Sequence, residues 1–167
     1  MFVLGIDPGV SRCGYGCVDG ATGTQSRAVA LGVITTPPSD PLPERLAVLD
    51  QELRALMADL EPAAVAVERV FFQVNARTAM SVGQASGLAM AAAARAGCEV
   101  VQYTPNEVKQ AVAGYGSASK EQVQRMVQSL LGLAEIPRPP DAADALALAL
   151  CHLAMAPLRA RLRATRP

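Results

Sequence analysis

The 167-residue chain is 51% hydrophobic and 18% charged, and it contains 13 glycines and 12 prolines. A chain of this length and composition can bury a single hydrophobic core, which excludes the disordered and low-complexity classes. Its 15 Lys and Arg residues balance its 15 Asp and Glu residues, so net charge alone gives no sign of a nucleic-acid partner. We expect one soluble, cytoplasmic domain, because no leader-like segment opens the chain and no uncharged stretch is long enough to span a membrane.

Three strands are predicted first. Apolar or β-branched runs occur at 2–6, 14–18 and 28–35 with turn residues between them, which is typical of an antiparallel meander. A proline-rich connection follows. Leucine and methionine then recur at helical spacing over 46–60, and the Glu-Pro pair at 61–62 ends this helix.

The rest of the chain alternates strands and helices. Strands are predicted at 63–68 and 99–103, and helices at 76–96, 105–113, 119–132 and 141–155. Capping boxes, formed by Thr104 with Glu107 and by Ser119 with Gln122, open two of these helices. The small residues of helix 76–96 give it a surface on which a second subunit can pack.

This order of elements predicts an α/β fold with three layers. A meander followed by strand, helix, strand and closing helices requires a five-stranded mixed sheet with helices on both faces, because parallel crossovers need helical connections. We expect 1–156 to form this domain. The arginine-rich residues 157–167 are expected to form a flexible basic tail.

Four carboxylates stand at the ends of apolar elements, where solvated loop acids are uncommon. Asp7 and Glu68 end predicted strands, and Asp141 and Asp144 open the last helix. If the two strands pair in parallel, Asp7 and Glu68 meet at the carboxyl edge of the sheet, where open α/β sheets bind ligands. Asp141 and Asp144, three residues apart, project from one side of the first helical turn.

Carboxylates gathered in one cleft repel one another unless a cation neutralises them, and oxygen ligands favour Mg²⁺ or Mn²⁺ over zinc. The four acids together predict a site for two such ions, which hydrolyses a phosphodiester without a covalent intermediate. Each acid also has an ordinary structural interpretation. Asp7 can start a turn, Glu68 can pair with a surface cation, and the two helical acids can cap their helix.

Six motifs follow in the same order as in a known family. They are GIDPG with GYG (5–16), VERVFF (67–72), GQA (83–85), VKQ (108–110), GYGSASK (114–120) and DAADAL (141–146). On these motifs, over residues 1–155, the chain resembles the RuvC family of bacterial Holliday-junction resolvases. The resemblance implies a ribonuclease H-like fold.

The resemblance implies a homodimeric endonuclease that nicks opposed strands of a four-way DNA junction with divalent metal, alongside the branch-migration proteins RuvA and RuvB. The residues that match the metal-binding catalytic acids of the family are Asp7, Glu68, Asp141 and Asp144. The resemblance implies that Phe71, Lys109 and Lys120 bind DNA, and Phe72, which also follows Glu68, is a second candidate for stacking on an unpaired base. Val74 replaces a lysine that is common in the family, and Arg77 is a candidate to supply that phosphate contact.

Three alternatives remain open. The GIDPG segment also resembles the first phosphate loop of the actin, Hsp70 and sugar-kinase group, but that group needs two such domains, and no second glycine-rich phosphate loop follows residue 60. A ribonuclease H-like relative linked to ribosomal RNA processing is a nearer alternative. A junction-binding module without nuclease activity is the third, although such a module has no need of four acids.

Overall fold

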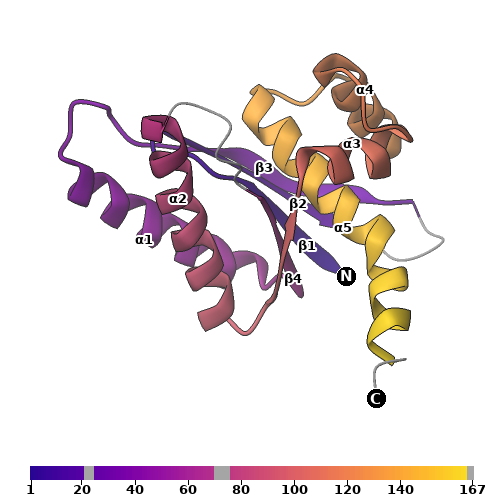
Figure 1. Cartoon of the computed structure of the whole chain (residues 1–167), viewed down its shortest axis with the longest axis horizontal. Coiled ribbons are helices and arrows are strands. Elements are labelled where there is room, and N and C mark those ends of the chain that lie inside the picture. Colours follow the sequence, from indigo (N-terminus) through magenta and orange to yellow (C-terminus); the bar gives the residue numbers. More distant parts are fainter. Residues whose placement is uncertain (21–24, 70–75, 165–167) are drawn as a thin grey trace.

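The computed structural model describes residues 1–20, 25–69 and 76–164. The elements in these ranges are β1 (Phe2–Asp7), β2 (Arg12–Asp19), β3 (Arg27–Thr35), α1 (Leu42–Leu60), β4 (Ala64–Glu68), α2 (Ala76–Arg95), β5 (Glu99–Tyr103), α3 (Pro105–Ala113), α4 (Lys120–Leu130) and α5 (Pro140–Ala164). The sheet runs through the middle of the molecule, with α1 and α2 on one face and α3, α4 and α5 on the other (Figure 1).

The sheet has the strand order β3-β2-β1-β4-β5. β1 pairs antiparallel with β2, and β2 pairs antiparallel with β3, as the predicted meander requires. β4 lies parallel to both β1 and β5. A mixed five-stranded sheet between two helical layers confirms the predicted fold class.

Alternation along β1 and β4 divides the core into two parts. The strand side chains that share a core with α1 and α2 are Leu4, Ile6, Val65 and Val67. Those that share a core with α5 are Val3, Ala64 and Ala66. Asp7 and Glu68 continue the second set, so the fold directs both acids toward the α5 side of the sheet.

Helix α5 lies directly on the sheet because glycines leave room at the points of contact. A Cβ atom on Gly5 would collide with the backbone carbonyl of Ala145, and one on Gly14 would collide with that of Asp141. A Cβ on Gly16 would lie 2.7 Å from Cγ of Leu146. These glycines therefore set the height of α5 above β1 and β2.

Within the described ranges, α5 is also the one helix whose length and hydropathy suit a membrane span. More than half of that stretch is buried inside the protein (56%). Its apolar composition follows from its place in the core, since the side chains from Ala142 to Cys151 are buried almost without exception.

Both predicted capping boxes are confirmed. The hydroxyl of Thr104 accepts a hydrogen bond from the backbone N–H of Glu107 at 3.1 Å, and the Glu107 carboxylate accepts one from the backbone N–H of Thr104 at 2.7 Å. The same two bonds join Ser119 and Gln122, at 3.2 and 2.8 Å. Local side-chain chemistry thus fixes where α3 and α4 begin.

The predicted end of the last helix is wrong. The sequence predicts an end near Met155 and a frayed tail, whereas α5 continues through Pro157 to Ala164. An interior proline loses one backbone hydrogen bond and crowds the carbonyl four residues earlier, but the leucine, arginine and alanine residues after Pro157 are strong helix formers. The division into a domain over 1–156 and a basic tail over 157–167 stays a prediction.

Candidate active site

Asp7 and Glu68 lie at the same edge of the sheet. They are the last residues of β1 and β4, which are adjacent and parallel. Both side chains are partly buried. The carboxyl ends of two neighbouring strands therefore present a pair of acids on the face that α5 covers.

The first turn of α5 brings two more acids to this edge. Asp7 pairs with Gly14 across the β1–β2 ladder, and the backbone carbonyl of Asp141 fills the space above Gly14. Asp141 is consequently close to Asp7. Asp144, three residues further along the helix, lines the same cavity as Asp7 and Glu68. The glycine-controlled packing of α5 thus joins acids from opposite ends of the chain.

The cavity has a volume of about 430 Å³. The charged residues of its lining are Asp7, Glu68, Asp144, Lys109 and Lys120. The remaining lining is mostly apolar and comes from α3, α4 and α5. Asp141 is not part of the lining, so three of the four predicted acids and both predicted lysines share one hollow.

The acids at this edge oppose one another electrostatically. Burial, and then the charges of Glu68, Asp144 and Asp141, raise the pKa of Asp7 from 3.8 to about 7. Burial and the charge of Asp144 also raise the pKa of Glu68. The positive charge of Lys120 counteracts both increases, and a bound divalent cation would do so more strongly.

Two protein cations already hold acids of the cluster. Lys120 Nζ donates to Oδ2 of Asp144 at 2.6 Å. Arg12 donates to Oδ2 of Asp141 from Nε at 3.1 Å and from Nη2 at 2.7 Å. Partial burial works against ionisation of Asp141, but the hydrogen bonds from Arg12 prevail and keep the pKa of Asp141 below its usual value.

The donor set fits a hard divalent cation. Four carboxylates supply only oxygen ligands, which suit Mg²⁺ or Mn²⁺. As the side chains stand, the described ranges contain no group of three or more His, Cys, Asp or Glu residues that is close enough to hold an ion. Asp144 is engaged by Lys120 and Asp141 by Arg12. Asp144 must therefore part from Lys120 to bind a metal ion through Oδ2, whereas Arg12 contacts only Oδ2 of Asp141.

Some predicted site residues cannot be placed. Phe71, Phe72 and Val74 lie outside the described residues. Arg77 belongs to the first turn of α2, but its side chain is not among those described. Sequence reasoning missed Arg12, although alternation along β2 places it on the same face as Gly14, beneath α5.

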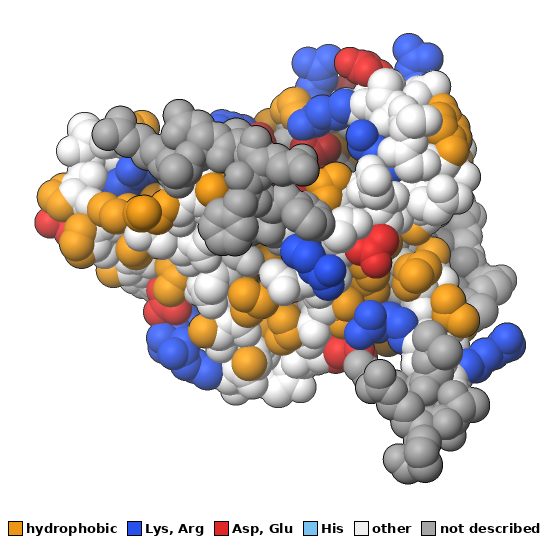
Figure 2. Space-filling view, viewed as in Figure 1, with side chains coloured by type: hydrophobic (Ala, Val, Ile, Leu, Met, Phe, Trp, Pro, Cys, Tyr) orange, Lys and Arg blue, Asp and Glu red, His pale blue; other side chains and the backbone are white. Residues whose placement is uncertain are grey.

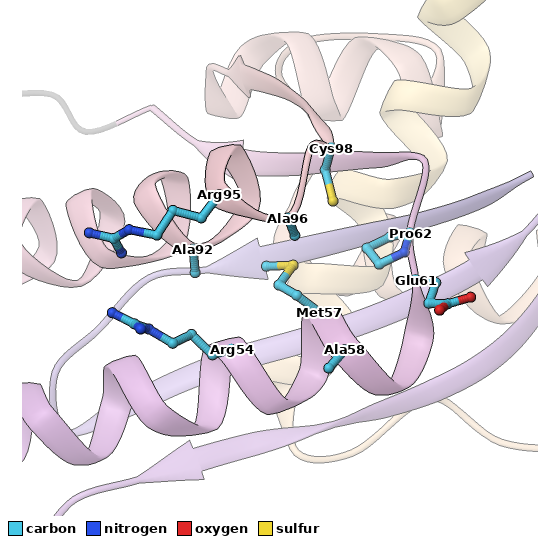
Figure 3. Close-up of a pocket in the computed structure, with 9 residues that line it drawn as sticks. All are labelled: Arg54, Met57, Ala58, Glu61, Pro62, Ala92, Arg95, Ala96 and Cys98. Carbon is cyan, nitrogen blue, oxygen red and sulfur yellow. The ribbon is translucent and has the colours of Figure 1, made fainter.

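A second cavity, of about 580 Å³, lies between α1 and α2 on the other face of the sheet. Arg54 and Arg95 extend at one end of it and Glu61 lies at the other, with Met57 between them (Figure 3). Glu61 is the single acid in its lining. This cavity has no carboxylate cluster, so the acid-rich cavity on the α5 side is the candidate active site.

A mixed sheet of this order, with acids at the ends of β1 and β4 and at the start of α5, defines a ribonuclease H-like nuclease domain. The family model described as "Crossover junction endodeoxyribonuclease RuvC" matches residues 3–152. The chain belongs to the RuvC family.

Curated relatives agree over nearly the whole length. The RuvC protein of Salinispora arenicola is 56% identical over 164 residues, which cover 98% of this chain and 94% of that protein. The RuvC protein of Moorella thermoacetica is 53% identical over 161 residues, which cover 96% of each.

Solved structures show the same fold. Thermus thermophilus RuvC in complex with Holliday junction substrate matches with a TM-score of 0.90 and 42% identity, over 95% of this chain and 96% of that one. The yeast mitochondrial Holliday junction resolvase Ydc2 matches with a TM-score of 0.66 over 97% of this chain and 83% of that one. At 14% identity, the second match supports the fold alone.

Proposed function

We propose that the chain is a structure-selective endonuclease, which resolves Holliday junctions by paired, symmetric, metal-dependent nicks during homologous recombination and DNA repair. The observation that carries this proposal is the cavity where acids from β1, β4 and α5 meet two lysines. Membership of the RuvC family supports it, as does the 42% identity to a RuvC protein solved with Holliday junction substrate.

The proposed metal ligands are Asp7, Glu68, Asp141 and Asp144, and the proposed cofactor is a pair of Mg²⁺ or Mn²⁺ ions. When bound, two such ions activate a water molecule and stabilise the leaving oxygen of a phosphodiester. Asp7 and Glu68, at fixed strand ends, provide the rigid side of the site. Asp144 provides an adjustable side, because its carboxylate must first part from Lys120.

Basic and aromatic residues are proposed to bind the DNA. Lys109 and Lys120 line the cavity, where their ammonium groups can hold phosphates and offset the charge that develops on the reacting phosphate. Phe71 and Phe72 follow Glu68 in the sequence, and one of them is proposed to stack on an unpaired base at the junction. Arg77, close behind them, is the proposed substitute for the missing lysine at position 74.

A homodimer is proposed because paired nicks need two active sites. The outer surface of α2 suits a second copy of the chain. Met80 is 66% exposed, and a Cβ on Gly83 or Gly87 would meet nothing within 4 Å. Over the part of α2 that Figure 2 does not draw in grey, most side chains are hydrophobic or uncharged.

We further propose that the protein acts in the cytoplasm on four-way junction DNA and together with the RuvA and RuvB proteins. Residues 157–167, beyond the proposed nuclease domain at 1–156, contain Arg159, Arg161, Arg163 and Arg166 and no acid. They are proposed to add affinity for DNA that does not depend on its sequence.

The test is cleavage of a labelled synthetic four-way junction, compared with linear duplex and with an RNA–DNA hybrid, in Mg²⁺, in Mn²⁺ and in chelator. We expect symmetric paired nicks in the junction alone, and none in chelator. Cutting of the hybrid instead would indicate an RNA-processing nuclease. Metal-independent junction binding without nicks would indicate a binding module, and ATP binding would indicate the nucleotide-binding alternative.

A further inference from the structure

Arg12 holds Asp141 through a single carboxylate oxygen. Both its Nε and its Nη2 atoms donate to Oδ2, at 3.1 and 2.7 Å. A bidentate pair would occupy both oxygens of the acid, whereas this geometry leaves Oδ1 unused by Arg12. We propose that Arg12 is a positioning residue, which orients Asp141 so that Oδ1 is presented to a divalent metal ion. This inference rests on the proposed function.

The backbone that carries Arg12 is itself held in place. Arg45 of α1 donates from Nη2 to the Ser11 hydroxyl at 2.5 Å and from Nε to the Thr36 hydroxyl at 3.0 Å. The Thr36 hydroxyl, which is buried, donates to the backbone carbonyl of Val10 at 2.7 Å. These hydrogen bonds hold the turn just before β2, so the backbone position of Arg12, the first residue of β2, is fixed.

Arg12 and Lys120 have different positions relative to the cavity. Lys120 is part of the cavity lining and holds Asp144 from within, so a metal ion or a phosphate competes with it for the same acid. Arg12 is not part of the lining. It can stay on Oδ2 of Asp141 while Oδ1 binds an ion, which is the arrangement expected of an outer partner that orients a metal ligand.

Orientation and charge act in opposite directions on metal affinity. A guanidinium beside the site repels a divalent cation, and this repulsion disappears when Arg12 is replaced by Gln. The Arg12 side chain is 50% exposed, so water and salt screen the repulsion. Loss of orientation is not screened, and loss of an outer partner typically lowers metal affinity by about 10- to 100-fold. Orientation therefore prevails.

Two substitutions separate these effects. Arg12→Gln removes both the charge and the two-donor contact, and Arg12→Lys keeps the charge but replaces the planar fork with a single ammonium. Arg54→Lys is the matched control, because Arg54 is 55% exposed and contacts Asp50 at 2.8 Å on the opposite face of the sheet. Each protein is titrated with Mn²⁺ in the absence of DNA, and the melting temperature as a function of Mn²⁺ concentration is fitted for the dissociation constant, which is the midpoint of binding.

We expect Arg12→Lys and Arg12→Gln to raise the Mn²⁺ midpoint roughly 10- to 100-fold, with Arg54→Lys unchanged. The Mn²⁺ requirement for junction cleavage rises in parallel, while the rate at saturating Mn²⁺ and the junction affinity of Arg12→Lys in chelator stay near the unsubstituted values. A normal midpoint in Arg12→Lys would overturn the proposal. Weaker junction binding by Arg12→Gln with a normal midpoint would instead make Arg12 a phosphate contact.

The experiment distinguishes failure of the proposed nuclease function from failure of the proposed role of Arg12. If the unsubstituted protein binds Mn²⁺ but does not nick junctions, the midpoints still test Arg12. If it shows no response to Mn²⁺ at all, the positioning role is overturned together with the metal site.

Discussion

Asp7 lies where burial and three neighbouring acids all oppose its negative charge. Asp7→Asn removes a proposed metal ligand and also a charge that repels the phosphates of DNA. We expect junction cleavage to fall by about 10²-fold or more, the scale of losing one stabilising group in an active site, while junction binding in chelator is retained or improved. Gel assays of cleavage and binding measure both.

Asp19→Asn is the matched control for this substitution. Asp19 is a partly exposed acid that pairs with the N-terminal amino group at 3.1 Å and lies outside the cavity. The Asp19→Asn protein should cleave junctions at the same rate as the unsubstituted protein. Undiminished cleavage by Asp7→Asn would remove Asp7 from the mechanism.

The raised pKa of Asp7 also predicts how stability depends on pH without metal. In the unfolded chain this carboxyl ionises near pH 3.8, whereas in the folded protein it stays protonated up to about pH 7. The folded state therefore holds more protons between these values, and the free energy of unfolding falls as the pH rises from about 4 to about 7. The fall due to Asp7 is on the order of 4 kcal/mol.

Urea unfolding in chelator, from pH 4.5 to pH 8, measures this effect as the difference between the unsubstituted protein and Asp7→Asn. The substituted protein should lack this part of the pH dependence and should be the more stable of the two at pH 8. Parallel stability curves would contradict the assigned environment of Asp7.

The candidate site could be predicted from the sequence as far as it depends on where elements end. Asp7 and Glu68 terminate strands, and Asp141 and Asp144 open a helix, so periodicity and turn residues were sufficient to single them out. Arg12 was not singled out, because its role depends on a contact 129 residues away in the chain. A single arginine at the start of a strand has no local pattern that indicates such a partner.

At the scale of elements, the contact between β1 and α5 leaves no room for a side chain at position 5. Gly5→Ala places a methyl group against the backbone carbonyl of Ala145, and neither backbone can give way without moving its element. We expect a loss of about 1–3 kcal/mol or more in the free energy of unfolding, together with weaker metal binding, because α5 would lift Asp144 away from Asp7.

Chemical denaturation of Gly5→Ala tests this packing. Gly116→Ala is a suitable control, since its new Cβ would lie no closer than 3.9 Å to its nearest neighbour. Gly5→Ala with normal stability and normal Mn²⁺ binding would contradict the view that glycine sets the height of α5.

The ends of elements could be predicted from the sequence where hydrogen bonds between neighbouring residues determine them. The two capping boxes gave the starts of α3 and α4, because the hydrogen bonds are made within four residues. The end of α5 was mispredicted because proline is a breaker only on average, and the residues that follow it favour helix. The direct seating of α5 on the sheet depends on tertiary packing, of which the glycines in β1 and β2 were the only local sign.

At the scale of the whole molecule, paired cleavage depends on the proposed dimer. Gly87→Arg places a long charged side chain on the outer surface of α2, where a Cβ meets nothing within 4 Å. The monomer should fold normally, with an unchanged circular dichroism spectrum, while the dimer dissociates and the two strands of a junction are no longer cut together. Sedimentation and a supercoiled cruciform substrate measure these two effects.

Val48→Arg provides the control for added charge. Val48 is 47% exposed on α1 and is not part of the α2 surface proposed as the interface, so this variant should remain dimeric. A dimer that survives Gly87→Arg would place the interface elsewhere. The small residues of α2 predict a surface on which a second copy can pack. The geometry of the dimer cannot be predicted from one chain, because nothing in the local pattern determines how two copies are oriented.

The seating of α5 over β1 has a consequence for the protein during its synthesis. Asp7 emerges from the ribosome early, whereas Asp141 and Asp144 emerge near the end. A nascent chain that has folded only β1 to β4 has Asp7 and Glu68 but lacks the other two proposed metal ligands, which belong to α5. If the proposed site is correct, the ability to cut DNA arises only after α5, the last helix to be synthesised, has docked on the sheet.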